Sequence, residues 1–263
     1  MSKDSLIAHL FHSNTRRWPF NTLEEGENWP YGEFGEFPLS ETVSLPTARP
    51  IDTSLSAAIA ARITCRSFAN DALSLEQISS LLFYTYGVEG RVDLGALEHL
   101  ERPVPSGGGL YPLELYLLVR RVDGLQPGAY HYFPLCHMLE LIKLLEVPDA
   151  MLAQLFLNQP YLADAAAVLV IAANLGRTMH KYEDRGYRYV LLEAGHAMQN
   201  VNLVAAALGA GACNAGGFFD SYLANLLGID LEREAPLYCA GLGMPATADR
   251  VHVRDPDRVL SGT

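Results

Sequence analysis

Positive charge is scarce in this sequence. Its 263 residues include 30 Asp and Glu against 19 Lys and Arg, which gives a formal net charge of −11 at pH 7. An acidic surface repels phosphate backbones, so nucleic acid is excluded as an expected partner. Lysine is rarer still, since only Lys3, Lys143 and Lys181 occur among those 19 basic residues. A lysine in a crowded region therefore raises the question of its protonation state.

Cysteines and long apolar runs are also few. The apolar stretches at 165–173 and 201–213 are shorter than the roughly 20 residues that span a bilayer, and residues 1–14 lack the apolar core of a secretion signal. No Cys-x-x-Cys pair occurs, which argues against a disulfide framework and a zinc site. We therefore expect a cytoplasmic, globular protein without a membrane partner. The four cysteines are far apart: Cys65, Cys136, Cys213 and Cys239.

The first 50 residues differ from the rest of the chain. Repeated Trp-Pro, Phe-Pro and Leu-Pro pairs interrupt any helical or strand period, while the aromatic residues are of the kind that dock on a surface. We expect 1–50 to be an irregular N-terminal arm and 51–263 to be one domain. Two roles for the arm stay open, a clasp between two copies or a strip that docks a partner.

Helical and strand patterns alternate after the arm, which indicates an α+β fold or a three-layer sandwich. Residues 87–112 are rich in Gly and Pro and are expected to be loop. Helices are predicted from Ser54 (with Leu55, Ile59 and Ile63 on one face), from Ser74 (with a Ser74–Gln77 capping box), and at 149–158, 187–208 and 221–227. Strands are predicted at 113–121, 129–133, 165–174, 210–215 and 236–242.

The predicted helix at 187–208 carries a heptad-like apolar stripe. Two alanines make the stripe narrow, so another helix can approach it closely. Its members recur at alternating spacings of three and four: Leu191, Ala194, Met198, Val201, Ala205 and Leu208.

The segment Arg62-Ile-Thr-Cys-Arg66-Ser-Phe68 follows the first predicted helix. Arg62 and Arg66 share one face if the helix continues, with the Thr64 hydroxyl between them. Two guanidiniums and a hydroxyl suit a phosphate monoester, because each Arg can donate two charge-assisted hydrogen bonds. On this segment alone, a pair of surface arginines is the simpler interpretation.

Two glycine-rich segments and one basic segment complete the candidates. Residues 105–112 read Pro-Ser-Gly-Gly-Gly-Leu-Tyr-Pro, and such a run lets the backbone lie flat against a ligand. Residues 214–220, Asn-Ala-Gly-Gly-Phe-Phe-Asp, lie at the end of a predicted strand and precede a predicted helix. Free N–H groups there can donate to a ring nitrogen or an oxyanion, although a plain turn looks much the same. Lys181 and Tyr182 lie near two arginines, where like charge favours a neutral amine able to act as a base. A solvated charge cluster is the alternative.

Metal sites find little support. Glu193-Ala-Gly-His196 has the Glu-x-x-His spacing of di-iron bundles, but a second copy is missing, so His196 is expected to pack within the helix bundle. His131 and His137 lie near Cys136 without a second ligand pair. We expect no metal centre.

Together and in this order, the motifs resemble one family. The matching stretches are RITCRSF (62–68), PSGGGLYPLELYLLV (105–119), PGAYHYF (127–133), RGYRYVLLEAGHAMQNVNLVAAALGAG (185–211), NAGGF (214–218) and APLYCAGLGMP (235–245). They resemble the SagB-type dehydrogenases of the FMN-dependent nitroreductase superfamily, which includes the thiazole/oxazole-forming peptide oxidases. The resemblance covers about residues 55–245.

The resemblance implies a fold and a cofactor site. The expected fold is an α+β three-layer sandwich with a central, mostly antiparallel sheet, in a homodimer with FMN at the subunit interface. Ile63 departs from relatives that often place a second basic residue there. The residues implied to hold FMN are Arg62, Thr64 and Arg66 at the phosphate and ribityl chain, Pro105, Ser106, Gly107 and Gly108 of the partner copy along the ring, Gly216 and Gly217 at the N5 edge, and Arg250 as a further phosphate contact.

The resemblance also implies an activity. Lys181 and Tyr182 match the Lys-Tyr pair that thiazole/oxazole-forming members carry near the flavin, so either side chain is the expected base in oxidation of an azoline to an azole. The substrate would be a peptide or a carrier-bound molecule, and a cyclodehydratase or a peptide synthetase would be the partner. Two alternatives remain, an NAD(P)H-dependent nitro- or quinone reductase and a non-catalytic partner in a peptide-modifying complex.

Overall fold

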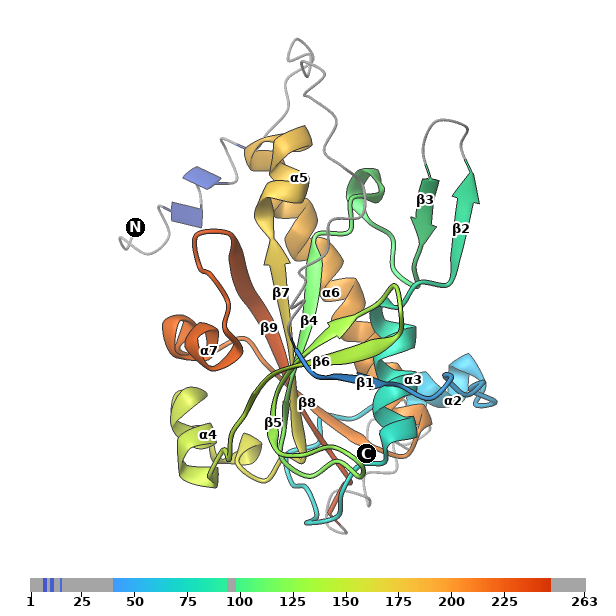
Figure 1. Ribbon diagram of the computed structural model, residues 1–263, viewed down its shortest axis with the longest axis vertical. Coiled ribbons are helices and arrows are strands. Elements are labelled where there is room, and N and C mark those ends of the chain that lie inside the picture. The colour runs from blue at the N-terminus through green and yellow to red at the C-terminus, as the bar shows by residue number, and fades with distance from the viewer. Residues whose placement is uncertain (1–6, 9, 12–14, 16–39, 94–97, 247–263) are drawn as a thin grey trace, which may run out of the picture.

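The computed structural model describes residues 7, 8, 10, 11, 15, 40–93 and 98–246. A seven-stranded sheet forms its centre, with strand order β1-β6-β5-β4-β7-β9-β8 and antiparallel pairing between all neighbours. A hairpin of β2 and β3 stands apart from this sheet (Figure 1). The strands are β1 (Thr42–Ser44), β2 (Gly90–Asp93), β3 (Glu98–Glu101), β4 (Leu113–Val119), β5 (Gly128–Phe133), β6 (Met138–Leu144), β7 (Ala167–Asn174), β8 (Gly211–Ala215) and β9 (Glu234–Gly243).

Helices pack on both faces of the sheet, which confirms the predicted three-layer α+β fold (Figure 1). One face packs against α3 and α6, and the other against α4 and α7. None of the described helices is long and apolar enough to cross a membrane. The helices are α2 (Leu55–Ala61), α3 (Leu75–Tyr86), α4 (Asp149–Leu155), α5 (Leu175–Tyr182), α6 (Asp184–Ala207) and α7 (Asp220–Leu227).

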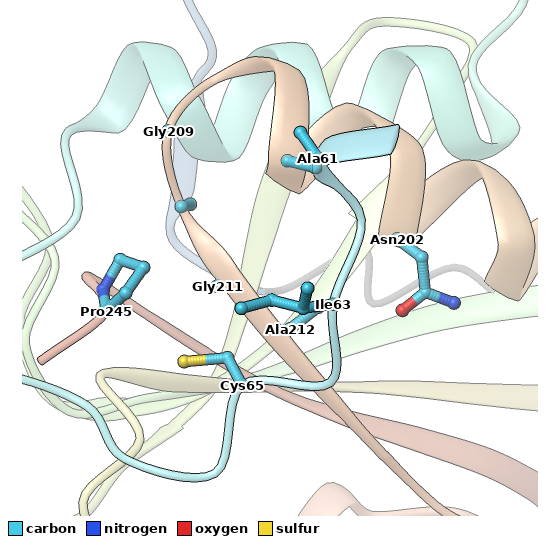
Figure 2. Close-up of a pocket in the computed structure, with 10 residues that line it drawn as sticks. Ala61, Ile63, Cys65, Asn202, Gly209, Gly211, Ala212 and Pro245 are labelled. Carbon is cyan, nitrogen blue, oxygen red and sulfur yellow. The ribbon is translucent and has the colours of Figure 1, made fainter. Parts of the chain in front are cut away.

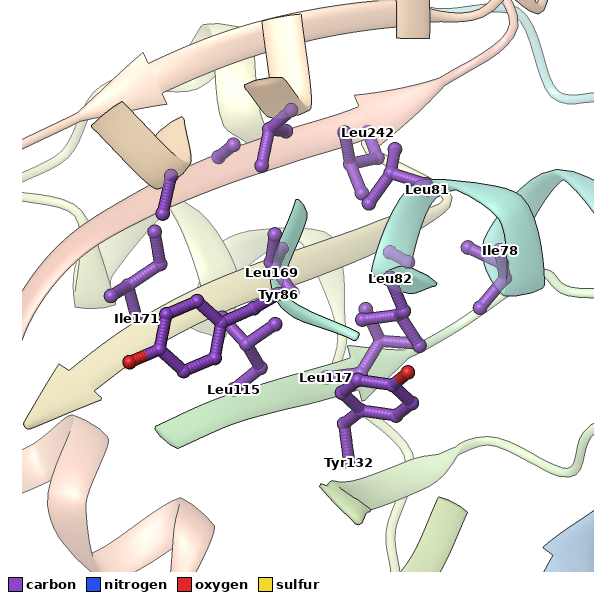
Figure 3. Packing of buried hydrophobic residues seen from close by; sticks show 14 of the residues in the cluster. Ile78, Leu81, Leu82, Tyr86, Leu115, Leu117, Tyr132, Leu169, Ile171 and Leu242 are labelled. Atoms are coloured by element: carbon purple, nitrogen blue, oxygen red, sulfur yellow. The ribbon is translucent and has the colours of Figure 1, made fainter. Parts of the chain in front are cut away.

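Strand β7 is the centre of both cores. Its Leu169 and Ile171 face α3 and α6, whereas Val168 and Val170 face α4 and α7, and all four are fully buried. Figure 3 shows the first of these layers, in which Leu169 and Ile171 belong to one apolar cluster with Leu82 and Tyr86 of α3. A strand covered on both faces reads as one continuous apolar run, and this is why the sequence predicted it.

Helix α3 begins where its capping box was expected. The Ser74 hydroxyl accepts the Gln77 N–H at 3.1 Å, and the Gln77 side chain accepts the Ser74 N–H at 2.9 Å. Two of the four unpaired N–H groups of the first turn are thereby satisfied. Helix α2 is confirmed as well, but it ends at Ala61, and its Leu55 and Ile59 are exposed rather than packed on the core.

Five elements were missed or misassigned from the sequence. Residues 90–93 and 98–101, expected to be loop, pair as the strands β2 and β3. Residues 138–144 form β6, whose sequence MLELIKL mixes charged and apolar residues, because its polar Glu140 is buried against a histidine. Residues 175–182 form α5, and residues 42–44 of the segment expected to be irregular pair with β6 as β1.

The apolar stripe of α6 packs on the chain's own core. Ala194, Met198 and Val201 are buried beside the sheet, whereas Leu191, predicted to belong to the same stripe, lies at its edge and is 42% exposed. Leu192 on the opposite side is 56% exposed. The helix therefore has a second apolar face that the described part of the chain leaves open to solvent.

Candidate active site

The glycine loop at residues 105–111 touches the Lys-Tyr pair. Gly107–Gly109 form a single 3₁₀ turn, and Gly108 has φ 70°, in the left-handed region. A β-carbon at Gly108 would lie 2.5 Å from the Tyr182 hydroxyl oxygen and 3.3 Å from Lys181 Nζ. Gly is therefore required here by the backbone conformation and by the close approach. Two segments that the sequence marked separately are brought together.

Lys181 and Tyr182 lie at the C-terminal end of α5. Lys181 is exposed, and its Nζ lies 5.6 Å from the centroid of the Tyr182 ring. The half-buried Tyr182 ring packs edge to face against Tyr189 of α6, with 5.0 Å between centroids. Glu183 has φ 51° and links α5 to α6, so the chain turns directly after the pair. The aromatic contact fixes the Tyr182 ring beside the glycine loop.

A buried ionic chain ties α5 to the sheet. Arg177 Nη2 donates to Glu114 Oε1 at 2.6 Å, and the other oxygen of Glu114 lies 2.9 Å from His131 Nε2. His131 Nδ1 is in turn 2.7 Å from Glu140 Oε2. Burial alone would lower the pKa of His131, but its hydrogen bonds to the two carboxylates raise it to about 9. A positively charged imidazole on β5 thus links β4 to β6, and Glu114 of β4 joins this chain to the helix that carries the Lys-Tyr pair.

A second buried carboxylate holds the other side of the glycine loop. Glu193 of α6 accepts hydrogen bonds at 2.6 Å from the hydroxyls of Ser106 and Tyr86. Burial raises the pKa of Glu193 to about 7, although both hydrogen bonds and the nearby Arg102 act in the opposite direction. Sequence reasoning missed this residue, because it tested Glu193 only as a metal ligand.

The arginine segment is extended rather than helical. The condition of a helix that continues through Arg66 is not met, since Arg62 is the C-cap of α2 and Thr64 forms a parallel bridge to Ala212 of β8. The Cys65 N–H donates to the Ala212 carbonyl at 3.0 Å. In an extended chain alternate residues share a side, and the exposure pattern follows this rule, with Thr64 and Arg66 exposed and Cys65 buried. Arg62, Thr64 and Arg66, the predicted phosphate-site residues, therefore share one side of the segment because it is extended, and not because it is helical.

The second glycine pair follows β8 directly. Gly216 is exposed, and a β-carbon there would meet no atom within 4 Å, whereas one at Gly217 would lie 3.0 Å from Leu157 Cδ1. Because Thr64 is paired to Ala212 in the same strand, the arginine segment and Gly216 lie along one edge of the sheet. From Ala212 to Gly216 the strand advances by four residue steps, or about 13 Å.

A cavity of about 310 Å³ lies beneath the arginine segment, at the end of α6 (Figure 2). Ile63 and Cys65 line one side of it, and Asn202 lies on another. The strand and the segment are close enough there that a β-carbon at Gly211 would lie 2.5 Å from Cys65 Sγ. The remaining lining residues are small: Ala61, Ala206, Gly209, Ala210, Gly211, Ala212 and Pro245.

The two groups of candidate residues lie at opposite ends of α6. Gly107 approaches Tyr189 near the start of the helix, whereas Ala206 lines the cavity near its end. These helix positions are 17 residues apart, which corresponds to about 25 Å. One copy of the chain therefore does not bring the glycine loop to the arginine segment. Arg250 lies outside the described residues.

The histidines considered as metal ligands are hydrogen-bonded to other side chains or exposed. His137 lies 2.8 Å from both the Ser79 and the Tyr132 hydroxyls, and His131 belongs to the ionic chain. His196, expected to pack within the helix bundle, is exposed on the open face of α6, so that expectation is wrong. Within the described ranges, no group of three or more His, Cys, Asp or Glu side chains could hold a metal ion.

The described arm residues contact the start of α6. The Thr15 carbonyl accepts from Arg185 Nη1 at 2.6 Å, its hydroxyl is hydrogen-bonded to Arg188, and the Phe11 ring packs edge to face on Tyr187. Thr15 is buried in this contact. Phe11 and Thr15 therefore contact a part of α6 that begins only a few residues after the Lys-Tyr pair in the sequence.

Known proteins share both the sequence and the fold of this chain. A protein of Methanocaldococcus jannaschii that carries the name nitroreductase MJ1384 is 40% identical over 182 residues, or 69% of this chain and 86% of that protein. The microcin B17-processing protein McbC of Escherichia coli is 32% identical over 169 residues, or 63% of this chain and 60% of McbC. The chain thus spans less than two thirds of McbC.

Solved structures agree with these relatives. A protein from Anabaena variabilis named as a nitroreductase has a TM-score of 0.72 at 29% identity, covering 90% of this chain and 47% of that one. A chain of the E. coli microcin synthetase McbBCD complex with truncated pro-MccB17 bound has a TM-score of 0.61 at 26% identity, covering 94% and 95%. The nitroreductase family model matches residues 59–244. The resemblance found in the motifs is confirmed, and the chain belongs to the nitroreductase family.

Proposed function

We propose that this protein is an FMN-dependent dehydrogenase that oxidises a thiazoline or oxazoline ring of a peptide or peptide-like molecule to the azole. The observation that carries the proposal is the contact between the glycine loop and the Lys-Tyr pair. A β-carbon at Gly108 would lie 3.3 Å from Lys181 Nζ and even closer to the Tyr182 hydroxyl. A glycine loop without side chains next to an amine and a phenol suits proton removal beside a planar cofactor.

The residues present fit FMN. Arg62 and Arg66 flank Thr64 on an extended segment, where their guanidiniums can donate paired hydrogen bonds to a phosphate. The exposed Gly216 leaves its surroundings open for an approaching ring. The chemistry supplied by bound FMN is acceptance of a hydride from the azoline.

The site requires two copies of the chain in this proposal. Because α6 separates the glycine loop from the arginine segment by about 25 Å, a homodimer in which Pro105, Ser106, Gly107 and Gly108 of one copy meet the arginines of the other would complete it. The exposed apolar side chains of α2 and α6, including Leu55, Ile59 and Leu192, support such an interface.

Lys181 or Tyr182 would take the proton in the proposed reaction. Aromatisation of an azoline removes a hydride from one ring carbon and a proton from its neighbour. The amine and the phenol are adjacent, so one can accept the proton while the other stabilises the charge that develops. The glycines of the loop carry no side chains that would stand between a flat ring and these two groups, and the Tyr182–Tyr189 contact holds the phenol in place.

The relatives support a peptide substrate. McbC is named for the processing of microcin B17, and the solved McbBCD complex holds a truncated pro-MccB17. We therefore expect the substrate to be a peptide or a carrier-bound molecule, and the partner to be a cyclodehydratase or a peptide synthetase that forms the azoline first.

The experiment compares Lys181→Ala with Lys181→Arg on a thiazoline-containing peptide, using FMN-loaded protein in air. Wild type should remove two hydrogens per ring, as read by mass spectrometry. Both variants should lose activity by about 100-fold or more, because an Arg keeps the charge but cannot act as a base. The control is Lys143→Ala, since Lys143 is bonded to the Asn225 carbonyl far from the loop. Full turnover in both Lys181 variants would refute the assignment of the base to Lys181.

An NAD(P)H-dependent nitro- or quinone reductase is the second candidate. It is favoured by the 40% identity to the protein named nitroreductase MJ1384, of which the match covers 86%. In that case the reduced nicotinamide, rather than an azoline, would be the hydride donor. The two functions differ in which compound reduces the flavin.

A further inference from the structure

We propose that Glu193 is a positioning residue, which fixes the glycine loop by accepting both hydroxyl hydrogen bonds that tie the loop to helix α6. The inference rests on the proposed function only in taking the loop to border the flavin. The hydrogen bonds that carry it are properties of the chain itself.

Two parallel relays end on the same carboxyl group. The Tyr111 N–H donates to Ser106 Oγ at 2.9 Å, and Ser106 Oγ donates to Glu193 Oε2 at 2.6 Å. The Leu113 N–H donates to the Tyr86 hydroxyl at 3.1 Å, and this hydroxyl donates to Glu193 Oε1 at 2.6 Å. Through these two hydroxyls, one side chain of α6 holds both the end of the glycine loop at Tyr111 and the start of β4 at Leu113.

The direction of these bonds specifies an ionised carboxylate. Each hydroxyl accepts a backbone N–H and donates its own hydrogen to Glu193, and a carboxylate, which carries no hydrogen, accepts from both. A protonated carboxyl or an amide would have to donate to one hydroxyl, whose hydrogen would then lose its acceptor. Protonation of Glu193 therefore releases one of the two relays. The loop segment with Ser106 is the more exposed of the two and is the one expected to move.

Among the titratable groups that surround it, Glu193 is the one whose charge changes near neutral pH. Tyr86 of α3 and Tyr111 of the loop face it, and burial raises the pKa of both phenols above the usual value. The Arg102 guanidinium lies 4.4 Å from the centroid of the Tyr86 ring and 5.0 Å from that of Tyr111 and stays charged. Burial raises the pKa of Glu193 itself to about 7. The loop should therefore tighten as the pH rises through this value.

The test uses the full chain, with Glu193→Gln, Glu193→Asp and the control Glu234→Gln. Glu234 is a matched control because it also accepts a tyrosine hydroxyl, that of Tyr116 at 2.8 Å, and burial raises its pKa too. The first readout is amide hydrogen exchange of the peptide spanning 105–113 without added FMN. It is measured at about pH 6 and about pH 8.5, on either side of the Glu193 pKa, and corrected for intrinsic exchange. The second readout is the dissociation constant of FMN, from the quenching of flavin fluorescence.

We expect wild type and Glu234→Gln to protect this peptide several-fold better at the higher pH. Glu193→Gln should lose that difference and bind FMN about tenfold more weakly at pH 8.5, the effect of one lost hydrogen bond. Glu193→Asp keeps the charge but is shorter, so it should retain part of the pH dependence. Equal protection at both pH values in wild type, or an unchanged profile in Glu193→Gln, would overturn the inference. If no variant binds FMN, the proposed function fails, and hydrogen exchange alone decides the role of Glu193.

Discussion

Gly108 of the glycine loop and Tyr182 of helix α5 are in contact, because a β-carbon at Gly108 would lie 2.5 Å from the Tyr182 hydroxyl oxygen. The contact joins the glycine loop, which precedes β4, to the end of α5, which follows β7. Nothing in the spacing of these residues along the sequence requires it. It makes the glycine loop and the Lys-Tyr pair one unit.

Substitution of Gly108 by Ala tests that unit. The methyl group would displace Tyr182, so we expect turnover to fall more than about tenfold, the effect of a small misplacement of a reacting group. The control is Gly124→Ala, since Gly124 also has a positive φ, 81°, but its β-carbon would come no nearer than 3.9 Å to Leu75. Both variants should lose about 1–2 kcal/mol of unfolding free energy to left-handed strain. Equal activity of the two variants would show that the Gly108–Tyr182 contact is irrelevant to the reaction.

The arginine pair should set the affinity for FMN. Arg62→Ala and Arg66→Ala each remove charge-assisted hydrogen bonds worth roughly 2 kcal/mol, so the dissociation constant should rise about 30-fold. Arg233→Ala, an exposed arginine ahead of β9, serves as the control. The measurement is a flavin fluorescence titration of the purified chain. A colourless wild-type protein that gains no flavin would instead favour the non-catalytic role.

His131 should make stability depend on pH in the alkaline range. Its pKa of about 9 in the folded protein is higher than the 6.5 of an unperturbed histidine. The folded state therefore holds the proton more tightly. This contribution to stability is complete below about pH 6.5 and is lost as the pH rises through 9.

A shift of this size corresponds to roughly 3 kcal/mol. We expect the unfolding free energy from urea titrations to fall by up to that amount between about pH 7 and pH 10. A His131→Gln variant should be less stable at pH 7 and should lack this part of the decline. If the unfolding free energy of wild type fell with pH no more than that of the variant, the result would contradict a charged His131.

The open apolar face of α6 should be the interface between two copies. Leu192→Glu places a charge on a side chain that is 56% exposed, and we expect it to convert a dimer into a monomer and to abolish FMN binding. Leu231→Glu is the matched control, because Leu231 is 46% exposed and lies in the turn before β9. Light scattering gives the mass of each. A wild-type monomer that binds FMN would refute the two-copy site.

Local signals account for what the sequence predicted correctly. The capping box of Ser74 and Gln77 lies within one helical turn, and β7 is a single apolar run, so neither depends on distant partners. Arg62 and Arg66 were expected to share one face of a continuing helix, but they share one side of an extended segment. Residues four apart lie on the same side in both cases, because the helix repeats about every 3.6 residues and the strand every two.

Distant partners account for what the sequence did not reveal. Glu193 lies 87 residues from Ser106 and 107 residues from Tyr86, and only the fold makes its carboxyl the end of both relays. Strand β6 has a charged residue at 140, whose burial makes sense only once His131 is known to lie opposite. Buried polar pairs of this kind leave no periodic signal.

The most direct test of the proposed reaction is anaerobic mixing of FMN-loaded protein with a thiazoline-containing peptide, followed by the absorbance of the flavin. The peptide should bleach the flavin within one turnover, and Lys181→Ala should slow this step about 100-fold or more. NADPH without peptide should bleach it far more slowly. Rapid bleaching by NADPH together with none by the azoline would contradict the proposed reaction and identify a nitro- or quinone reductase.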